Sequence, residues 1–381
     1  MRAFPMWCLV FFGALAQAGE PRLEVTEKFH ARTGLKEMTT EAVFHHARVI
    51  YKTWTEPGKT EVVINKWVDY VFGLEPGRGS GAGRNDGWSV WRFLGIFYAK
   101  DGGRPANALT GFQAGPATLT RFDECAMVDF VFPLDAEGEA GTVAVKLAEF
   151  PSHPDWLFCR ATFDGGTKKP RRIERIDLSA YSGNSRQPPE RERWAAMADR
   201  EFNLGREPAS FAPAGPGLML FNKFLQEDAG VLLVYEPDAY AKLTIPKTSA
   251  GVNIQLTPKP DRKVFHFALG TFREQAPADV RPRFFDETAD LVASFMSGIN
   301  WAPPLPADAL GRSAAEVEQL LADLAADGVE TAIFAEEWAA LRERYAAAAK
   351  DGDAAAAFAA LADADNLRHR AAAAGLAAWR Q

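Results

Sequence analysis

The residues best suited to proton transfer lie close together near the middle of the sequence. Glu149 precedes the turn Ser152-His153-Pro154-Asp155-Trp156, so one imidazole lies between two carboxylates. Such an imidazole can act as a general acid or base when the groups converge within hydrogen-bond reach. Asp155 before Trp156 also suits an ordinary turn. The sequence therefore leaves both interpretations open for Glu149, His153 and Asp155.

Asp129 is a further acidic candidate because it interrupts the apolar run 127–132. A strand of this composition is expected to be covered on both faces, so its carboxylate must be paired or have a raised pKa. Groups of this kind are enriched at functional sites. An ion pair with an arginine of the segment 171–175 is the structural alternative. No spacing decides between the two.

A glycine-rich segment, 75–87, ends beside aromatic and planar polar side chains. Aromatic faces stack on the C–H faces of sugars, and planar polar groups bind sugar hydroxyls. Long loops on β scaffolds are often functional. Together with the turn at 152–156, this loop gives a predicted set of ligand-binding residues: Arg84, Asp86, Trp88, Trp91, Asp155 and Trp156. Packing of the tryptophans in the core is the alternative.

Three other motifs are rejected as cofactor or metal sites. The run 77–82 matches a dinucleotide fingerprint, but no helix follows whose N-terminus could meet a pyrophosphate. His45 and His46 are adjacent on a predicted strand, so their side chains would point to opposite faces. Asp351-Gly352-Asp353 resembles the start of a calcium loop, but the acidic ligand expected near its end is missing. The sequence therefore predicts no cofactor and no metal.

The first eighteen residues are typical of an export signal. Arg2 supplies a positive region, residues 4–16 an apolar one, and Ala16-Gln17-Ala18 a small-x-small cleavage site. Cleavage after Ala18 is expected, with an uncleaved membrane anchor as the alternative. No later segment is long and apolar enough to cross a membrane, so the predicted mature chain is exported, to the periplasm or the exterior.

The composition limits the classes of protein to which this chain can belong. Loss of residues 1–18 removes Arg2, which leaves 42 of the 43 basic side chains against 50 acidic ones, a net charge of −8. This balance argues against a nucleic-acid partner. Hydrophobic residues make up 47% of the chain, with 27 phenylalanines, enough for a large core.

Cys125 and Cys159 are the cysteines left after signal cleavage. Export permits a disulfide, worth roughly 3 to 4 kcal/mol on the chain-entropy model. However, the first and third strands of a simple meander lie about 9.5 Å apart, whereas a disulfide needs Cα atoms within about 7 Å. A bond and two buried thiols both remain open.

The segment 118–163 organises the predicted fold. It contains three expected strands, 121–133, 142–150 and 156–163, and the middle one alternates Val143, Val145 and Leu147 with small or polar residues. Further strands are expected at 22–31, 41–54, 60–74, 88–99, 171–182, 218–226, 231–236, 241–246, 252–257 and 263–271, with 183–216 irregular. Evenly spaced strands without alternating helices predict a mainly β fold: a large antiparallel β-sandwich followed by a small α-helical C-terminal domain.

The C-terminal part changes to helical patterns. Asp286 is expected to cap a first helix, with Leu291 and Val292 on its apolar side, and Ser313-Ala314-Ala315-Glu316 forms a capping box for the next. The predicted domain bounds are 1–18 for the signal, 19–275 for the sandwich, 276–300 for a helix packing on it, 301–312 for a Pro-rich linker and 313–381 for a helical hairpin domain.

The last helices carry a resemblance. Their apolar positions have the spacing seen in one tetratricopeptide helical hairpin: Trp338, Leu341, Tyr345, Ala354 and Phe358. The likeness covers about one repeat unit, and departs from the family pattern at Arg342, Leu361 and Asn366. We predict a generic helical hairpin, with a peptide-binding repeat as the alternative that the resemblance implies.

Two functions from different classes follow from these patterns. Export, aromatic richness and the sandwich scaffold favour carbohydrate binding or processing, with a glycan as the ligand, an associational argument that leaves catalysis open. The alternative is a non-catalytic envelope or assembly protein that docks a protein partner through its tail. An exposed apolar stripe along Trp338, Leu341 and Tyr345 would favour the alternative.

Overall fold

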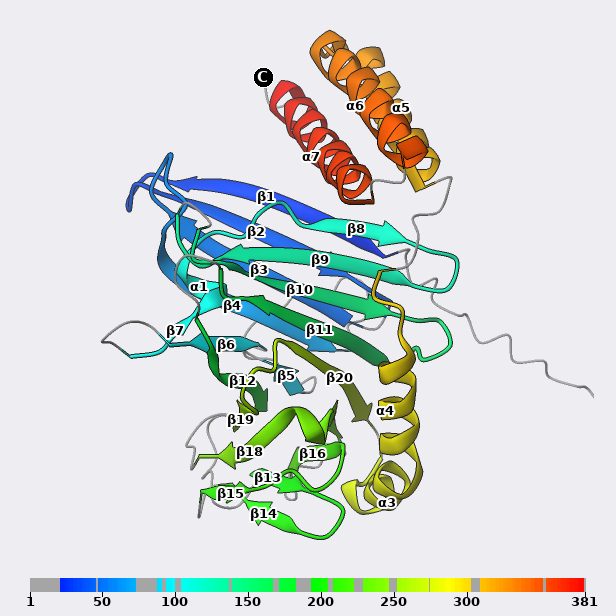
Figure 1. Cartoon of the computed structure of the whole chain (residues 1–381). Coiled ribbons are helices and arrows are strands. Elements are labelled where there is room, and N and C mark those ends of the chain that lie inside the picture. The colour runs from blue at the N-terminus through cyan, green and yellow to red at the C-terminus, as the bar shows by residue number, and fades with distance from the viewer. Residues whose placement is uncertain are drawn as a thin grey trace, which may run out of the picture.

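A computed structural model gives the fold of the chain (Figure 1). It describes residues 21–45, 47–72, 88–90, 94–99, 104–136, 139–166, 171–182, 193–204, 208–222, 229–246, 252–273, 275–302, 309–351 and 354–379. The expected signal and the glycine-rich segment therefore lie outside the described residues. So do Arg84, Asp86 and Trp91.

Two antiparallel sheets form the body of the described chain, which confirms the predicted β-sandwich. The helix-covered sheet has nine strands: β8 (Thr118–Arg121), β9 (Ala126–Pro133), β10 (Thr142–Glu149), β11 (Trp156–Asp164), β13 (Arg193–Ala196), β14 (Glu201–Asn203), β16 (Gly217–Asn222), β17 (Ala229–Tyr235) and β20 (Val264–Arg273). The opposing sheet has eleven: β1 (Arg22–His30), β2 (Leu35–Val43), β3 (Ala47–Thr55), β4 (Val62–Phe72), β5 (Trp88–Val90), β6 (Gly95–Tyr98), β7 (Ala106–Asn107), β12 (Ile173–Ser182), β15 (Ala209–Phe211), β18 (Tyr240–Ile245) and β19 (Val252–Pro258).

The central strands β9, β10 and β11 form the expected antiparallel meander. Period-two alternation sends Val143, Val145 and Leu147 into the core between the sheets, because successive side chains of a strand point to opposite faces. The expected first strand, 121–133, is in fact two, because the chain turns between Arg121 and Ala126. The outer face of β9 is not fully covered, since Val131 is 44% exposed.

Helices form a second layer on the outer face of the helix-covered sheet. α3 (Pro277–Arg283) continues through a π-helical turn, Phe284–Thr288, into α4 (Ala289–Gly298). Val292 and Met296 of α4 are buried in a second apolar cluster against the sheet. A Cβ on Gly217 of β16 would lie 3.0 Å from the Ala289 Cβ. A larger residue there would therefore push the helix away.

Three C-terminal helices form a bundle beside the sandwich: α5 (Ala309–Ala326), α6 (Ala332–Asp351) and α7 (Ala354–Trp379). The bundle lies over β1 and β8, which end the two sheets (Figure 1). Glu316 of α5 connects the two parts because it contacts Arg121 of β8 at 3.6 Å and Arg368 of α7 at 2.6 Å. Covering edge strands prevents them from pairing with other chains.

Several element boundaries differ from the sequence prediction. The strand expected at 41–54 is two strands, and His45 lies in the turn between them. His46 lies outside the described residues, so the argument about the two faces of this pair stays a prediction. The segment expected to be irregular contains β13, β14 and β15. Strands of three or four residues show too few alternations to be recognised.

The helix starts were also placed too late. The first helix begins at Pro277, not at Asp286, and α5 begins at Ala309, ahead of its expected capping box. Leu291, expected on the apolar side of α4, is 68% exposed. Proline at the first helical turn is a start signal that competes with a downstream acidic cap.

Both described cysteines are free and buried. Cys125 precedes β9 on the helix-covered face, and Cys159 of β11 lies in the core between the sheets. Burial raises the pKa of the Cys125 thiol to about 11 and raises that of Cys159 as well. The alternative of two buried thiols is therefore the one that the structure shows.

Candidate functional site

A line of titratable side chains crosses the middle of the helix-covered sheet. Lys146 of β10 is the direct cross-strand neighbour of Asp129 on one side and of Arg160 on the other. Arg160 of β11 faces His266 of β20 in the same way. Glu236 follows β17 and contacts the His266 ring. We call these five residues the polar row.

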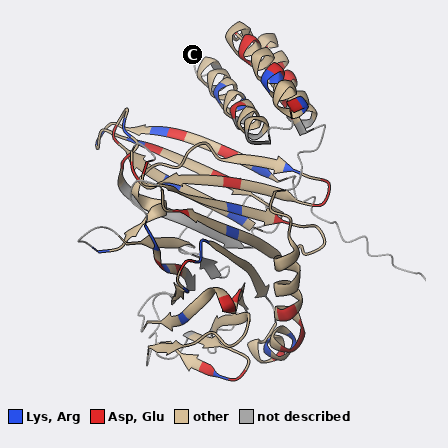
Figure 2. Cartoon of the chain, viewed as in Figure 1, with Lys and Arg blue, Asp and Glu red and all other residues tan. Residues whose placement is uncertain are grey.

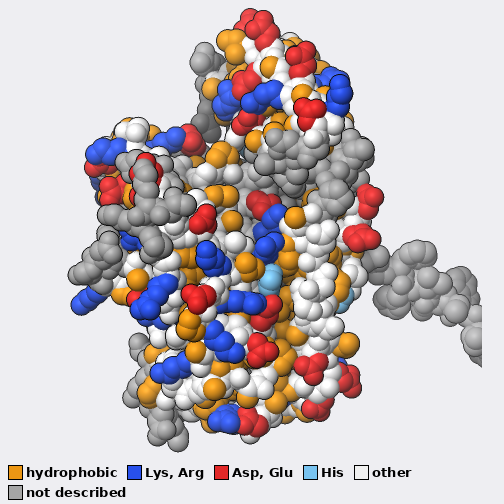
Figure 3. Space-filling view, in the orientation of Figure 1, with side chains coloured by type: hydrophobic (Ala, Val, Ile, Leu, Met, Phe, Trp, Pro, Cys, Tyr) orange, Lys and Arg blue, Asp and Glu red, His pale blue; other side chains and the backbone are white. Residues whose placement is uncertain are grey.

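The polar row lies on the outer face of the sheet, because the residues on either side of it along each strand point into the core. Figure 2 shows the basic positions in the middle of β10 and β11. Lys146 and Arg160 are the basic residues of these two strands. Figure 3 shows basic, acidic and histidine side chains gathered near the centre of the same face.

The position of α3 and α4 sets one boundary of the row. Two residues further along the same strands, the outer face carries side chains that belong to the apolar cluster under the helices: Met127, Ala148, Phe158 and Ala268. Two residues in the other direction lie Val131, Ala144, Thr162 and Val264, all half-buried or exposed. The row therefore marks the place where the helix cover ends.

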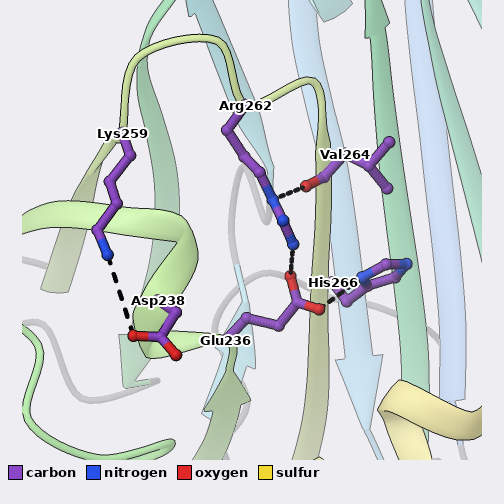
Figure 4. A network of polar contacts seen from close by, with 6 residues as sticks. All are labelled: Glu236, Asp238, Lys259, Arg262, Val264 and His266. Carbon is purple, nitrogen blue, oxygen red and sulfur yellow. Dashed lines mark hydrogen bonds and ion pairs between the residues drawn. The ribbon is translucent and has the colours of Figure 1, made fainter.

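One end of the row is a network around Glu236 (Figure 4). The carboxylate contacts His266 Nδ1 at 3.0 Å through Oε1 and accepts a hydrogen bond from Arg262 at 2.6 Å through Oε2. Burial alone would raise the pKa of Glu236, but the bonds and charges of His266 and Arg262 outweigh it and lower that pKa. Glu236 thus holds the imidazole in one orientation as an ionised partner.

The other end of the row is an ion pair between Asp129 and Lys146, with 3.2 Å between Oδ1 and Nζ. Burial raises the pKa of Asp129, although Lys146 and Arg160 act in the opposite direction. The expected alternative partner, an arginine of 171–175, was wrong, because the cross-strand neighbour takes that place.

Trp301, just beyond α4, covers part of the row. Its ring stacks on the His266 ring with 5.7 Å between centroids, and its carbonyl accepts a hydrogen bond from Lys146 Nζ at 2.9 Å. Only 6% of the residue is exposed, and the indole N–H is buried without a hydrogen-bond partner in the described part of the chain. The segment after α4 therefore adds an aromatic surface to the polar row.

The predicted proton-transfer group does not converge in the expected way. Glu149 contacts the backbone N–H of His45 at 3.0 Å and its Nδ1 at 2.7 Å. Glu149 shares the strand face of Leu147, opposite to that of Lys146. His153 contacts Ser152 and stacks on Phe295 of α4 at 3.8 Å, and burial lowers its pKa.

The predicted ligand-binding residues within the described chain fall in different places. Asp155 is exposed in the β10–β11 turn, whereas Trp156 is buried in the apolar cluster and stacks on Phe284. Trp88 begins β5 of the opposing sheet, whereas the polar row belongs to the helix-covered sheet. The structure therefore does not bring these residues together at one site.

The predicted partner-binding residues Trp338, Leu341 and Tyr345 are buried inside the bundle. Trp338 and Leu341 pack among apolar residues of α5 and α7, and Tyr345 packs against residues of α7. The exposed stripe that would favour a docking tail is thus not formed by these residues.

Sequence patterns alone did not find most of the polar row. Arg160 and His266 come from separate strands and Glu236 follows a third, and each looks like an ordinary polar position in an alternating pattern. A usable signal was present in the composition of β9, β10 and β11, whose central residues are all charged while both flanks are apolar.

The described residues were also considered for a metal site and for a membrane-spanning helix. No group of three or more His, Cys, Asp or Glu side chains there is arranged to hold a metal ion. Among the described helices, none combines the length and apolarity needed to span a bilayer.

Comparisons with known proteins were made on sequence and on structure. No family model matches the chain, and no curated protein matches it in sequence. Solved structures similar to it include a galactose mutarotase related enzyme from Lactobacillus acidophilus, at 8% identity and a TM-score of 0.32. That match covers 62% of this chain and 98% of the other.

Two further solved structures are similar to part of this chain. Heparinase III matches at 9% identity and a TM-score of 0.29, covering 68% of this chain and 38% of that protein. YidC from Thermotoga maritima matches at 12% identity and a TM-score of 0.31, covering 74% and 58%. At these scores the likenesses carry no argument about this chain, and its function has to be inferred from its own side chains.

Proposed function

We propose that the polar row and Trp301 form a carbohydrate-binding site on the outer face of the helix-covered sheet. The observation that carries this proposal is that ionisable side chains from four strands lie side by side, with the Trp301 ring stacked on the ring of His266. This proposal replaces the glycine-rich loop and the turn at 152–156 as the location of the binding site.

The side chains of the row suit a sugar because they combine donors and acceptors in fixed positions. Arginine and carboxylate groups bind pairs of vicinal hydroxyls, and aromatic rings cover the apolar face of a pyranose. Each end of the row is held by an ion pair, Asp129 with Lys146 and Glu236 with Arg262. Such support keeps the side chains in place before a ligand arrives.

The pair of His266 and Glu236 also allows proton transfer. One imidazole nitrogen lies 3.0 Å from the carboxylate, an arrangement that orients the ring for general acid or base chemistry. The binding function does not require this step. Turnover of a bound sugar is the finer proposal, to be tested once a ligand is known.

The experiment is a glycan-array screen of residues 19–381 followed by titration of the strongest ligand. Replacing His266 with Gln removes the imidazole ring and its contact with Glu236. We expect the affinity to fall about tenfold, the value of one hydrogen bond to a charged group.

His45→Gln is the matched control, because it breaks a histidine–carboxylate pair on the opposite face of β10. It should leave the affinity unchanged. A blank array from a folded sample would overturn the proposal, as would equal losses in the two variants.

We also propose that the chain acts outside the cytoplasm, on the basis of the pattern in residues 1–18. Expression of the complete sequence in a Gram-negative host, with N-terminal sequencing of the periplasmic product, tests it. A new terminus at Gly19 is expected. A cytoplasmic product that keeps residues 1–18 would contradict it.

A further inference from the structure

Arg160 stands at the centre of the polar row, yet no ion pair or hydrogen bond of its side chain is found in the described part of the chain. Its Nε is buried and unpaired. The two carboxylates of the row are engaged elsewhere, Asp129 with Lys146 and Glu236 with His266 and Arg262. The positive charge of the central guanidinium is therefore not balanced by a direct partner.

A second unpaired donor lies next to it. Trp301 contacts Lys146 through its carbonyl and His266 through its ring, and these two residues are the cross-strand neighbours of Arg160 on either side. Trp301 therefore lies across the position of Arg160, and its indole N–H is buried without a partner.

Two buried donors without acceptors are costly to a folded protein, because each loses its hydrogen bonds to water. An acceptor that carries no hydrogen of its own and bears negative charge would satisfy both donors and balance the guanidinium. A carboxylate meets these conditions, since its two oxygens match the parallel N–H groups of arginine.

We propose that the site selects acidic sugars, and that Arg160 is the residue that determines this specificity by binding the carboxylate of a hexuronic acid. Trp301 donates its indole N–H to the same group. The inference rests on the proposed carbohydrate site and names the class of its ligand. Neutral sugars would leave the charge of Arg160 unbalanced and would bind more weakly.

The experiment compares two oligosaccharide series on residues 19–381: hexuronic-acid oligomers and the same oligomers with their carboxyl groups reduced to alcohols. Wild-type protein should bind the acidic series at least about tenfold more tightly, which is the value of one charge-assisted bidentate contact. The preference should shrink as salt is raised, because salt screens the charge interaction.

Arg160→Gln should abolish the preference by weakening the acidic series about tenfold while leaving the neutral series within about twofold. Arg160→Lys keeps the charge but loses the planar donor pair, so it should retain an intermediate preference. The matched control is Arg200→Gln, at an exposed arginine paired with its neighbour Asp199. Thermal unfolding and circular dichroism check that each variant is folded.

The outcomes separate the two proposals. Equal binding of acidic and neutral oligomers by the wild type, or equal loss of both in Arg160→Gln, overturns the acidic preference and leaves the carbohydrate site standing. Competition by inorganic sulfate or phosphate as effective as that of the uronic acid would show a simple anion site and overturn the inference. Failure of both series to bind overturns the carbohydrate site together with this inference.

Discussion

The outer face of the helix-covered sheet contains two regions with the same backbone and opposite chemistry. Met127, Ala148, Phe158 and Ala268 lie under α3 and α4, and two residues away on the same strands lie Asp129, Lys146, Arg160 and His266. The first set excludes water and holds the helix layer. The second set keeps charges on a surface that the helices leave uncovered.

The difference shows how one sheet can hold a layer of helices and still present charged side chains on the same face. An apolar set stabilises the fold through burial, and this stabilisation depends on the apolar area removed from water, not on the direction of the contacts. A charged set is stable only where water or fixed partners remain within reach. The end of the helix layer is therefore where a binding site can form on this face.

The largest effect is expected for Phe158→Ala in the apolar set. Phe158 is completely buried and packs against Phe150 and Phe295. Truncation should lower the free energy of unfolding by about 3–5 kcal/mol, measured by urea denaturation. Val131→Ala, on the uncovered side of the row, should cost less than about 1 kcal/mol. Equal costs would contradict the distinction between the two regions.

Glu236→Gln should lower stability by about 1–3 kcal/mol near neutral pH, because Arg262 and His266 lose their charged partner. The pKa of Glu236 is lowered in the folded state, so the stability that the carboxylate contributes is present above its ordinary pKa of 4.5. This contribution is lost as the pH falls through the lowered value. Unfolding curves of both proteins from pH 7 downwards should therefore converge, and a gap that widens towards acid would refute the assigned role.

For Asp129→Asn, the difference in stability from the wild type should change with pH in the opposite direction to that for Glu236→Gln. The change should also be smaller. Burial raises the pKa of Asp129 above its ordinary value of 3.8, so the folded state binds the proton more tightly than the unfolded state. Wild-type stability should then fall, relative to the Asn variant, as the pH rises from 3.8 through the raised value. The same unfolding series measures it. A relative gain of the wild type over that range would contradict the burial of this carboxylate.

The smallest effect is expected for Trp301→Phe. The change keeps an aromatic ring over His266 and removes an indole N–H that has no partner in the described chain. Stability should change by less than about 1 kcal/mol, since the buried donor made no hydrogen bond. Trp301→Ala should cost about 3–5 kcal/mol by contrast. Similar losses of stability in both variants would mean that the indole N–H has a hydrogen-bond partner in solution.

The fold followed from the sequence more fully than the site did. Alternation in residues 142–150 and 156–163 predicted the central strands because the apolar side of each strand faces the core. The polar row depends on the register between strands that are far apart in the sequence. His266 meets Arg160 only because β20 pairs with β11, and no local pattern encodes that pairing.

Asp129 and Glu149 show the same limit. The sequence singles out Asp129 as an acid that interrupts an apolar strand and Glu149 as an acid close to His153, and both have partners in the structure. The partners are Lys146 on the next strand and His45 in the turn between β2 and β3, neither of which local spacing could select. Residue type could thus mark a buried acid, but only the assembled sheets show what it contacts.

A crystal structure with the strongest array ligand would show whether a sugar binds across the polar row. We expect a sugar in contact with Lys146, Arg160 and His266, beside the Trp301 ring. A sugar bound instead on the opposing sheet near β5, or on the helical bundle, would contradict it.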